Sequence, residues 1–353
     1  MTFTAAEQHA MQRALELAAT PGVPLGPNPR VGCVLLAADG TTLAEGFHLG
    51  AGTPHAEAAA LATAREAGVD VRGATAVVTL EPCNHTGRTG PCALALVEAG
   101  VSRVVFATGD RNPVAVGGAE TLRAAGIEVE SGLLESESRE LNRVWAFAVE
   151  HQRPFVTWKF ATSLDGRSAA MDGTSKWITS AAARQDTHRL RALADTVLVG
   201  TGTVLADDPQ LTVRDADEVA LPDQPLRAVM GLRELPARAR IFDGSAGTTH
   251  LRMHDPREAL AQLFARDRQH VFLEGGPTLA AAFFKAGLVD EVVAYVAPVL
   301  LGTGRNAVAD LGIETIADAR HLRVTDVAVL EAVGQDTCVR ITMSTASTHP
   351  EGN

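Results

Sequence analysis

Four residues in the first hundred offer the ligands and the free carboxylate of a hydrolytic metal site. His55 and Glu57 stand two positions apart, and Cys83 and Cys92 each follow a proline. Imidazole and thiolate suit zinc, and three protein ligands leave the fourth tetrahedral position to water. Zinc makes hydroxide available near neutral pH, and a carboxylate that does not bind the metal can move the proton. The pattern predicts zinc on His55, Cys83 and Cys92, with Glu57 as the catalytic residue.

The order of these residues is close to a known deaminase pattern. His-x-Glu followed by Pro-Cys-x-x-Cys is typical of zinc enzymes that remove an amino group from a nucleobase. This chain differs in one respect, because eight residues separate its two cysteines. His85 lies on the same loop and is a rival ligand, which we interpret as a substrate contact or a loop residue. Cys33, in the middle of a predicted strand, is expected to pack in a core.

Each of these residues is predicted to lie at an end of a helix or strand. His55 starts a helix that runs to Ala67, and Cys92 opens a helix that runs to Ala99. Cys83 follows an apolar strand over 74–80. Alternating helices and strands indicate an α/β sheet with helices on both faces. The other predicted elements here are helices over 4–20, 121–125 and 134–151 and strands over 31–36, 42–47, 101–108 and 127–129.

A second α/β run follows a break at Pro154, so we expect two domains, 1–150 and 151–345. In the second domain a strand over 270–274 leads through Gly275-Gly276 into a helix that starts at Pro277. Helix N-termini after glycine turns bind anions, and a cofactor diphosphate is a natural ligand there. The other predicted elements are strands over 155–161, 196–199, 227–230, 291–296 and 338–343 and a helix over 180–193.

Composition limits the partners. The net charge is -11, and residues 1–148 carry 10 Arg and no Lys against 16 Asp and Glu, so we expect no nucleic-acid partner. Four cysteines in 353 residues fit a reducing compartment. The sequence has no apolar run long enough to span a bilayer and no signal-peptide pattern at its start. We therefore expect a cytoplasmic protein without membrane contact.

Three motifs in the first half occur together: Pro27-Asn28-Pro29-Arg30-Val31-Gly32-Cys33-Val34, His55-Ala56-Glu57, and the fourteen residues from Thr79 to Cys92. Together they resemble the deaminase half of the bifunctional deaminase-reductases of riboflavin biosynthesis, in which the cysteines are also separated by eight residues. Gly90 stands where that family usually has proline. The resemblance implies a cytidine-deaminase-like α/β/α domain. It also implies the same zinc ligands, Glu57 as proton shuttle, and a substrate site lined by Asn28, His48 and Arg88.

The second half carries five motifs in the order of the same family's reductase domain: 159–167, 175–180, 200–214, 274–279 and 297–302. The resemblance implies a dihydrofolate-reductase-like α/β domain that uses NADPH. By the same resemblance, the cofactor contacts are Ala161, Trp177, Thr203, Asp207, Gly276, Pro277, Thr278, Leu279, Ala280, Ala281 and Ala282. The implied substrate contacts are Ser175, Arg191, Leu211, Arg214 and Glu274. Two arginines suit a sugar phosphate.

The implied activity has two steps. The first domain would deaminate 2,5-diamino-6-(5-phosphoribosylamino)pyrimidin-4-one, and the second would use NADPH to reduce the ribosyl group, giving 5-amino-6-(5-phosphoribitylamino)uracil. Water, Asp165 and Glu274 are all candidates for the proton donor of the reduction. A homo-oligomer, either dimer or tetramer, is expected from the family alone.

One departure and two rival hypotheses remain. The family often has Ile-Asp-Ser after the strand at Arg227, with the serine on the cofactor, whereas this chain has Leu232 and then Arg233. Arg233 is then a candidate for the adenosine 2′-phosphate, and the preference for NADPH over NADH is open. One rival is a nucleic-acid base deaminase with an accessory domain. The other is an active deaminase joined to a reductase-like domain that only senses nucleotide.

Overall fold

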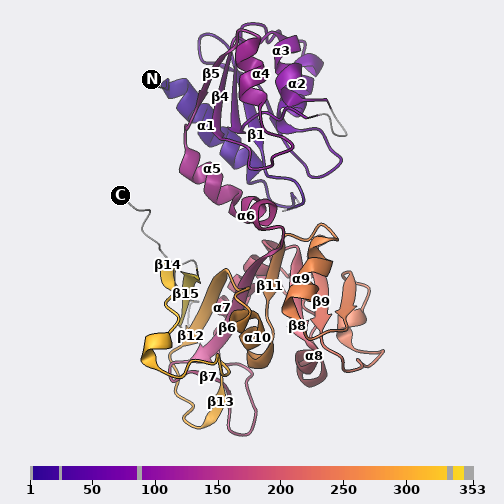
Figure 1. Cartoon of the computed structure of the whole chain (residues 1–353), viewed down its shortest axis with the longest axis vertical. Helices are drawn as coiled ribbons and strands as arrows, with labels where there is room; N and C mark the ends of the chain where they lie inside the picture. Colours follow the sequence, from indigo (N-terminus) through magenta and orange to yellow (C-terminus); the bar gives the residue numbers. More distant parts are fainter. Residues whose placement is uncertain (1–2, 24–25, 86–89, 332–336, 346–353) are drawn as a thin grey trace. The chain divides into compact units, whose positions relative to one another are not determined.

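The computed structural model describes residues 3–23, 26–85, 90–331 and 337–345. The chain forms two compact units, Met1–Gln152 and Arg153–Asn353 (Figure 1). Each unit is built on its own sheet and is described separately.

The first unit has a five-stranded mixed sheet in the order β2-β1-β3-β4-β5. The hairpin β1–β2 and the pair β1–β3 are antiparallel, whereas β3, β4 and β5 run parallel. The strands are β1 (Gly32–Leu36), β2 (Thr42–Phe47), β3 (Thr75–Leu80), β4 (Arg103–Thr108) and β5 (Glu128–Ser131). The helices are α1 (Ala5–Ala18), α2 (Ala56–Glu66), α3 (Cys92–Ala99), α4 (Gly118–Ala124), α5 (Glu135–Leu141) and α6 (Arg143–His151).

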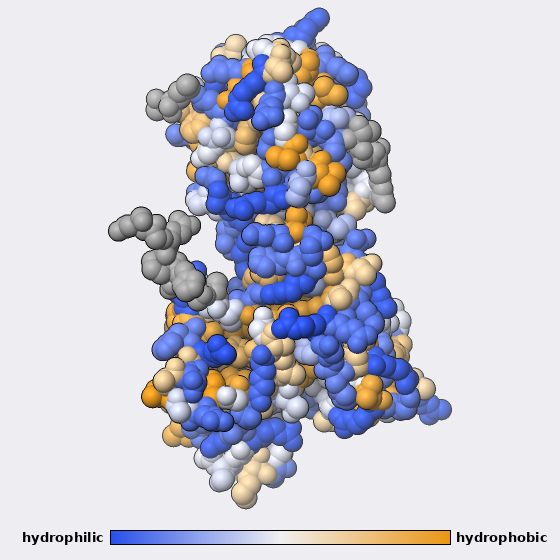
Figure 2. Space-filling view, viewed as in Figure 1, coloured by the Kyte–Doolittle hydropathy of each residue, from blue (hydrophilic) through white to orange (hydrophobic). Residues whose placement is uncertain are grey.

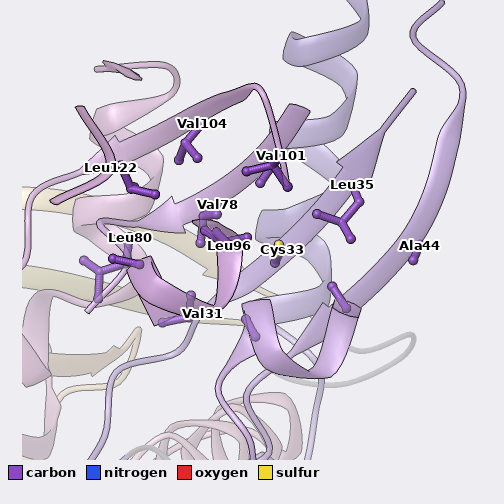
Figure 3. Packing of buried hydrophobic residues seen from close by; sticks show 14 of the residues in the cluster. Val31, Cys33, Leu35, Ala44, Val78, Leu80, Leu96, Val101, Val104 and Leu122 are labelled. Carbon is purple, nitrogen blue, oxygen red and sulfur yellow. The ribbon is translucent and has the colours of Figure 1, made fainter. Parts of the chain in front are cut away.

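Helices cover both faces of this sheet, as predicted. On one face, alanines of α2 and Leu96 of α3 pack against alternate strand residues such as Cys33, Val78 and Val104 (Figure 3). On the other face, Met11 and its neighbours in α1 pack on the intervening strand residues. Because strand side chains alternate between faces, each strand contributes to both cores.

Two glycines allow helices to approach the sheet closely. A Cβ on Gly32 would lie 1.9 Å from the carbonyl oxygen of Ala14 in α1, and a Cβ on Gly46 would lie 2.2 Å from the backbone nitrogen of Ala60 in α2. At the start of α1, Thr4 and Glu7 form a capping box. The close packing of α2 against β2 fixes the helix whose first turn carries Glu57.

The second unit has an eight-stranded sheet in the order β10-β9-β8-β11-β6-β12-β15-β14. Neighbours from β10 to β12 are parallel, and β15 and β14 add antiparallel strands. The main strands are β6 (Phe155–Ser163), β8 (Thr196–Gly200), β9 (Leu226–Met230), β10 (Thr248–Leu251), β11 (His270–Leu273), β12 (Glu291–Ala297), β14 (Arg323–Leu330) and β15 (Cys338–Ser344), and a small sheet pairs β7 (Arg167–Ala170) with β13 (Gly304–Asn306). The helices are α7 (Ala181–Ala192), α8 (Thr201–Asp207), α9 (Pro256–Phe264) and α10 (Pro277–Lys285), with 3-10 turns at Arg240–Phe242 and Ile316–Asp318.

Helices lie on both faces of this sheet as well. Leu260 of α9 and Phe283 of α10 belong to one apolar core, and Val204 of α8 and Ala183 of α7 belong to two smaller ones. The face shown in Figure 2 is mainly hydrophilic, with hydrophobic residues in small groups. Among the described residues, no helix combines the length and the apolar character needed to cross a membrane.

The sequence pattern missed several elements of the second unit. Helix α8 lies in the motif 200–214, which we treated only as a source of cofactor and substrate contacts, and β10, α9 and β14 were not predicted. Strand β14 is mostly exposed, so its residues show no strong contrast between a buried and a solvent face. The region 134–151, predicted as one helix, is two helices with Asn142 between them.

Candidate functional sites

The three predicted zinc ligands meet at one edge of the first sheet. Cys83 follows β3, His55 is the N-cap of α2, and Cys92 is the first residue of α3. Nδ1 of His55 lies 3.4 Å from each of the two sulfur atoms. Their ligand atoms all lie within 4.8 Å of one another. Zinc bonds of about 2.0 Å to nitrogen and 2.3 Å to sulfur place tetrahedral ligands about 3.5 Å apart, so the set fits zinc.

The protonation of Cys83 suits a cation, whereas the hydrogen bond to Cys83 and burial raise the pKa of Cys92. The side chain of Cys92 hydrogen-bonds to Cys83 and, with a smaller contribution from His55, lowers the pKa of the Cys83 thiol. The backbone N–H of Cys92 also points at the sulfur of Cys83, at 3.5 Å. A thiolate is the form that binds zinc, and a helix N-terminus favours it.

Glu57 lies in the first turn of α2 and is only 3% exposed. Burial raises the pKa of its carboxyl group to about 7. A carboxyl group with a pKa near neutrality can both accept and deliver a proton. His55, Glu57 and Cys83 help to line a cavity of about 140 Å³.

Asn28 and His48, two predicted substrate contacts, line the same cavity. Nδ1 of His48 lies 2.9 Å from the carbonyl oxygen of Pro54, and its Nε2 lies 2.9 Å from the amide nitrogen of Asn28. A carbonyl can only accept, so Nδ1 carries the proton and Nε2 accepts from Asn28. Burial lowers the pKa of His48, which keeps the ring neutral. The third predicted contact, Arg88, lies outside the described residues.

Sequence reasoning missed part of the cavity wall. Asp110 and Asn112 line it beside His85, the residue considered as a rival ligand. Asp110 follows β4, which runs parallel to β3, so its strand end lies beside that of Cys83. The position of Asp110 and Asn112 after a buried strand was the available signal. His85 is not part of the metal-ligand cluster found among the described residues.

The second unit contains a larger cavity, of about 700 Å³, beside the carboxyl ends of β6 and β11. Ligands of parallel α/β sheets bind at this edge, where neighbouring crossovers leave in opposite directions. The predicted contacts that line the cavity are Ala161, Ser175, Trp177, Arg191, Asp207, Leu211, Arg214, Glu274, Gly276 and Pro277.

The remaining predicted cofactor contacts are not in the cavity wall. Thr203 lies in α8, and Thr278, Leu279, Ala280, Ala281 and Ala282 continue α10. Ala280 is fully buried among the sheet side chains, and its N–H is bonded to the carbonyl of Gly276. The helical period turns Ala280 and Ala281 toward the core and leaves Thr278 exposed, and Pro277 is the residue of α10 that lines the cavity.

An ion pair joins two predicted substrate contacts. Nε of Arg191 is 2.5 Å from one oxygen of Glu274, and its Nη2 is 3.0 Å from the other. Burial raises the pKa of Glu274, but Arg191, Lys159 and His188 together outweigh it, and the pKa is lowered. Glu274 is therefore ionised at neutral pH. Lys159, which sequence reasoning did not assign a role, lines the cavity, and burial lowers its pKa.

Asp165 lies outside the cavity wall and has a structural role. Its carboxylate accepts hydrogen bonds from the hydroxyl of Ser163 and from the backbone N–H groups of Leu301 and Gly302. These bonds, with that of Ser163 the strongest, lower its pKa to about 2. We therefore reject Asp165 as proton donor.

Arg233, the candidate for the 2′-phosphate, does not line the cavity, and its Nε lies 3.4 Å from the hydroxyl of Thr201.

Comparisons with known proteins identify the family of each unit. Residues 4–108 match the family described as the cytidine and deoxycytidylate deaminase zinc-binding region, and residues 154–339 match the RibD C-terminal domain. The chain is 50% identical to the riboflavin biosynthesis protein RibD of Mycobacterium tuberculosis H37Rv, over 88% of this chain and 89% of that protein. It is 39% identical to RibD of Escherichia coli K12, over 95% and 99% of the two chains.

A solved structure shows the same fold over the whole chain. The diaminohydroxyphosphoribosylaminopyrimidine deaminase/5-amino-6-(5-phosphoribosylamino)uracil reductase of Thermotoga maritima has a TM-score of 0.86 and 34% identity, covering 96% of this chain and 98% of that one. The first unit is thus a cytidine-deaminase-like domain with a zinc-binding region, and the second a dihydrofolate-reductase-like domain of a family that uses NADPH. The chain belongs to the RibD family of bifunctional deaminase-reductases of riboflavin biosynthesis.

Proposed function

We propose that the chain deaminates 2,5-diamino-6-(5-phosphoribosylamino)pyrimidin-4-one in the first unit and reduces the ribosyl group of the product in the second. The observation that carries the proposal is the meeting of His55, Cys83 and Cys92 beside the buried carboxyl group of Glu57. The cavity at the ends of β6 and β11 supports the second step, because it combines buried charges with the glycine turn that opens α10.

In the first unit, His55, Cys83 and Cys92 are proposed to hold zinc. The metal, when bound, lowers the pKa of a water toward about 7. Glu57 then takes one proton of that water and gives it to the ring nitrogen. It passes a second proton, from the hydroxyl group on the attacked carbon, to the amino group, which leaves as ammonia. Burial keeps the ring of His48 neutral, the hydrogen bond to the carbonyl of Pro54 fixes its orientation, and Nε2 then orients the amide of Asn28 toward the substrate.

In the second unit, NADPH supplies a hydride for C1′ of the ribosyl group. Arg191 and Glu274 hold each other at the cavity wall and fix α7 to the end of β11. Opening the sugar ring also requires a proton. Because Asp165 is outside the cavity and Glu274 is ionised, we propose Lys159 as the donor, since its lowered pKa makes it a stronger acid than an exposed lysine.

A two-readout assay tests both steps on the same sample. The full-length protein is given the diaminopyrimidine ribotide, zinc and NADPH, and ammonia release and NADPH oxidation are followed separately. We expect ammonia to appear first and NADPH oxidation to depend on it. With the deaminated uracil as substrate, NADPH oxidation should proceed without ammonia. If the ribotide released ammonia but neither substrate led to NADPH oxidation, the proposed second step would be contradicted. A second domain that only senses nucleotide would then be supported.

Metal removal should separate the two activities. A chelator such as dipicolinate is expected to abolish ammonia release, because His55, Cys83 and Cys92 lose their shared cation, and added zinc should restore it. NADPH oxidation with the deaminated uracil should be unchanged, which serves as the internal control. Zinc content, measured by atomic emission, should fall with ammonia release. Full ammonia release by protein without metal would contradict the site.

The assembly state and the cellular compartment stay predictions. We propose a cytoplasmic homo-oligomer, and the mass in solution by light scattering distinguishes a dimer or tetramer from a monomer.

A further inference from the structure

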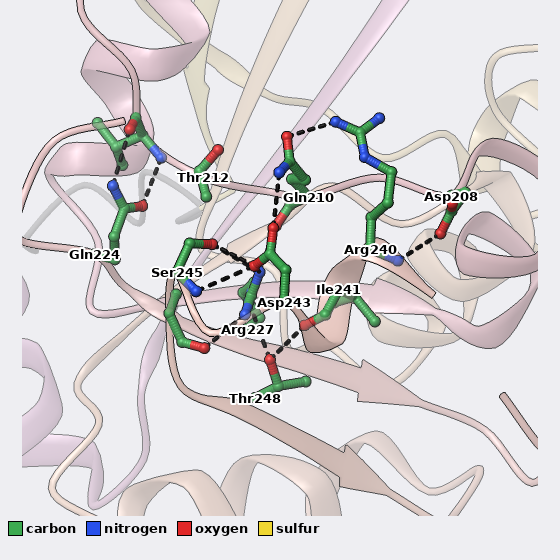
Figure 4. A network of polar contacts seen from close by, with 12 residues as sticks. Asp208, Gln210, Thr212, Gln224, Arg227, Arg240, Ile241, Asp243, Ser245 and Thr248 are labelled. Atoms are coloured by element: carbon green, nitrogen blue, oxygen red, sulfur yellow. Dashed lines mark hydrogen bonds and ion pairs between the residues drawn. The ribbon is translucent and has the colours of Figure 1, made fainter. Parts of the chain in front are cut away.

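One end of the cavity in the second unit brings two guanidinium groups to a single oxygen atom. Gln210, Arg214 and Arg240 all line this end. The side-chain carbonyl of Gln210 accepts hydrogen bonds from Nη2 of Arg214 and from Nη2 of Arg240, the second of which is drawn in Figure 4. Because both arginines donate to one atom, their charges are held side by side.

The orientation of the Gln210 amide is fixed from behind. Its nitrogen donates to Oδ2 of Asp243 at 2.7 Å, and Oδ1 of Asp243 is 2.8 Å from Nη1 of Arg227 (Figure 4). The amide nitrogen must face a carboxylate, which only accepts, so the carbonyl must face the arginines, which only donate. If the amide were rotated by half a turn, its nitrogen would face the donors of the two arginines and its oxygen would face the carboxylate of Asp243.

Arg227 anchors this network in the protein interior. It lies on β9, is completely buried, and donates to the hydroxyl of Thr248 and the carbonyl of Ala246 as well as to Asp243. A buried guanidinium needs an ionised partner. Ser245 and Arg227 hydrogen-bond to Asp243 and lower its pKa, so that partner is present at neutral pH.

Two guanidinium groups at this end of the cavity lack a close carboxylate partner among the described residues. Arg227 is matched by Asp243, and Arg191 by Glu274. Arg240 forms no ion pair with the residues that the structure describes, and its guanidinium donates to the neutral Gln210. Among the described residues, the ion-pair partner of Arg214 is Glu218, at 3.8 Å and with its side chain 69% exposed. Two adjacent cations with a neutral acceptor between them favour a dianion, and guanidinium groups match the geometry of phosphate.

We propose that Arg240 is a phosphate-binding residue of the reductase site, which together with Arg214 holds a phosphate monoester, and that Gln210 positions both guanidinium groups. This inference rests on the proposed reduction. Two reactants carry such a group, namely the ribotide with its sugar phosphate and NADPH with its 2′-phosphate. The predicted substrate contacts include two arginines, Arg191 and Arg214, but Arg191 is already paired with Glu274. Arg240 therefore supplies the second positive charge beside Arg214.

The test compares ligands with and without the phosphate on the full-length protein. Reduction is measured with the uracil ribotide and its dephosphorylated form, and with NADPH and NADH. In Arg240→Met we expect the KM of one phosphorylated ligand to rise about ten- to a hundredfold, because that ligand loses a charged hydrogen bond. The KM of its phosphate-free counterpart and kcat should stay within about twofold. Arg240→Lys should recover part of the loss, and Gln210→Met should raise the same KM with less effect.

Arg238→Met is the matched control, because Arg238 is an exposed arginine of the same segment that does not line the cavity. Inorganic phosphate should compete with the affected ligand in the wild type and more weakly in Arg240→Met. A KM effect confined to the ribotide identifies the sugar phosphate, and one confined to NADPH identifies the 2′-phosphate. If Arg240→Met had the same KM as the wild type for each of the four ligands, and the same melting temperature, the inference would be overturned. A wild type that reduces none of them would instead refute the proposed function.

Discussion

Glu57→Gln should lower ammonia release by about a hundred- to ten-thousandfold, the range that general acid–base catalysis contributes. Glutamine keeps the size of the buried side chain but cannot carry the proton between water, ring and leaving group. The three possible zinc ligands are untouched, so zinc content should equal that of the wild type. NADPH oxidation with the deaminated uracil should also be unchanged, because it takes place in the other unit.

The matched control for this variant lies at the end of the same helix. Glu66 is exposed at the C-terminus of α2, away from the cavity, and Glu66→Gln should leave both activities unchanged. Ammonia release by Glu57→Gln at the rate of Glu66→Gln would mean that another group moves the proton. Asp110, whose pKa is raised to about 6 mainly by burial and which lines the cavity, would then be the next candidate.

Arg191→Ala should abolish reduction and destabilise the second unit by about 3–5 kcal/mol, the cost of leaving one partner of a buried ion pair alone. The side chains of Arg191 and Glu274 are only 14% and 10% exposed. Reduction should fail because Glu274 loses the partner that holds it at the cavity wall. Unfolding in denaturant, followed together with NADPH oxidation, measures both effects, and ammonia release should remain.

The effect on stability should depend on pH in a defined direction. Since the folded state lowers the pKa of Glu274, its ion pair contributes stability at neutral pH, and this contribution disappears as the pH falls through the lowered value. The stability difference between the wild type and Arg191→Ala should therefore be largest near neutral pH and shrink in acid.

Two further variants distinguish the effect of breaking the buried ion pair from the effect of removing an arginine charge. Arg189→Ala, on the same helix but 54% exposed at its side chain, should change stability by about 1 kcal/mol or less. The double variant Arg191→Met with Glu274→Gln should regain much of the stability, because neither charge of the ion pair remains, but should not regain reduction. Equal stability of Arg191→Ala and the wild type would contradict the structural role of the pair.

Local sequence patterns determined the α/β class and most elements of both units. The capping box at Thr4 and Glu7, the apolar strands and the proline-cysteine pairs are local signals, and the structure has the corresponding helix and strand ends. The eight-residue separation of Cys83 and Cys92 was likewise readable, and it pointed to the family that the comparisons then showed. Exposed elements such as β14 gave no such signal, because their side chains do not alternate between core and solvent.

Only the tertiary structure decided which distant side chains meet. Arg191 and Glu274 are 83 positions apart, and Asp165 and Gly302 are 137 apart, so no local pattern could distinguish a cavity residue from a loop anchor. Likewise, the predicted cofactor contacts run from Gly276 through Ala282, yet the helical turn directs Ala280 into the core. Sequence alone thus determined which chemical groups the chain carries. Packing decided which of them face a cavity, because that depends on contacts between segments far apart in the chain.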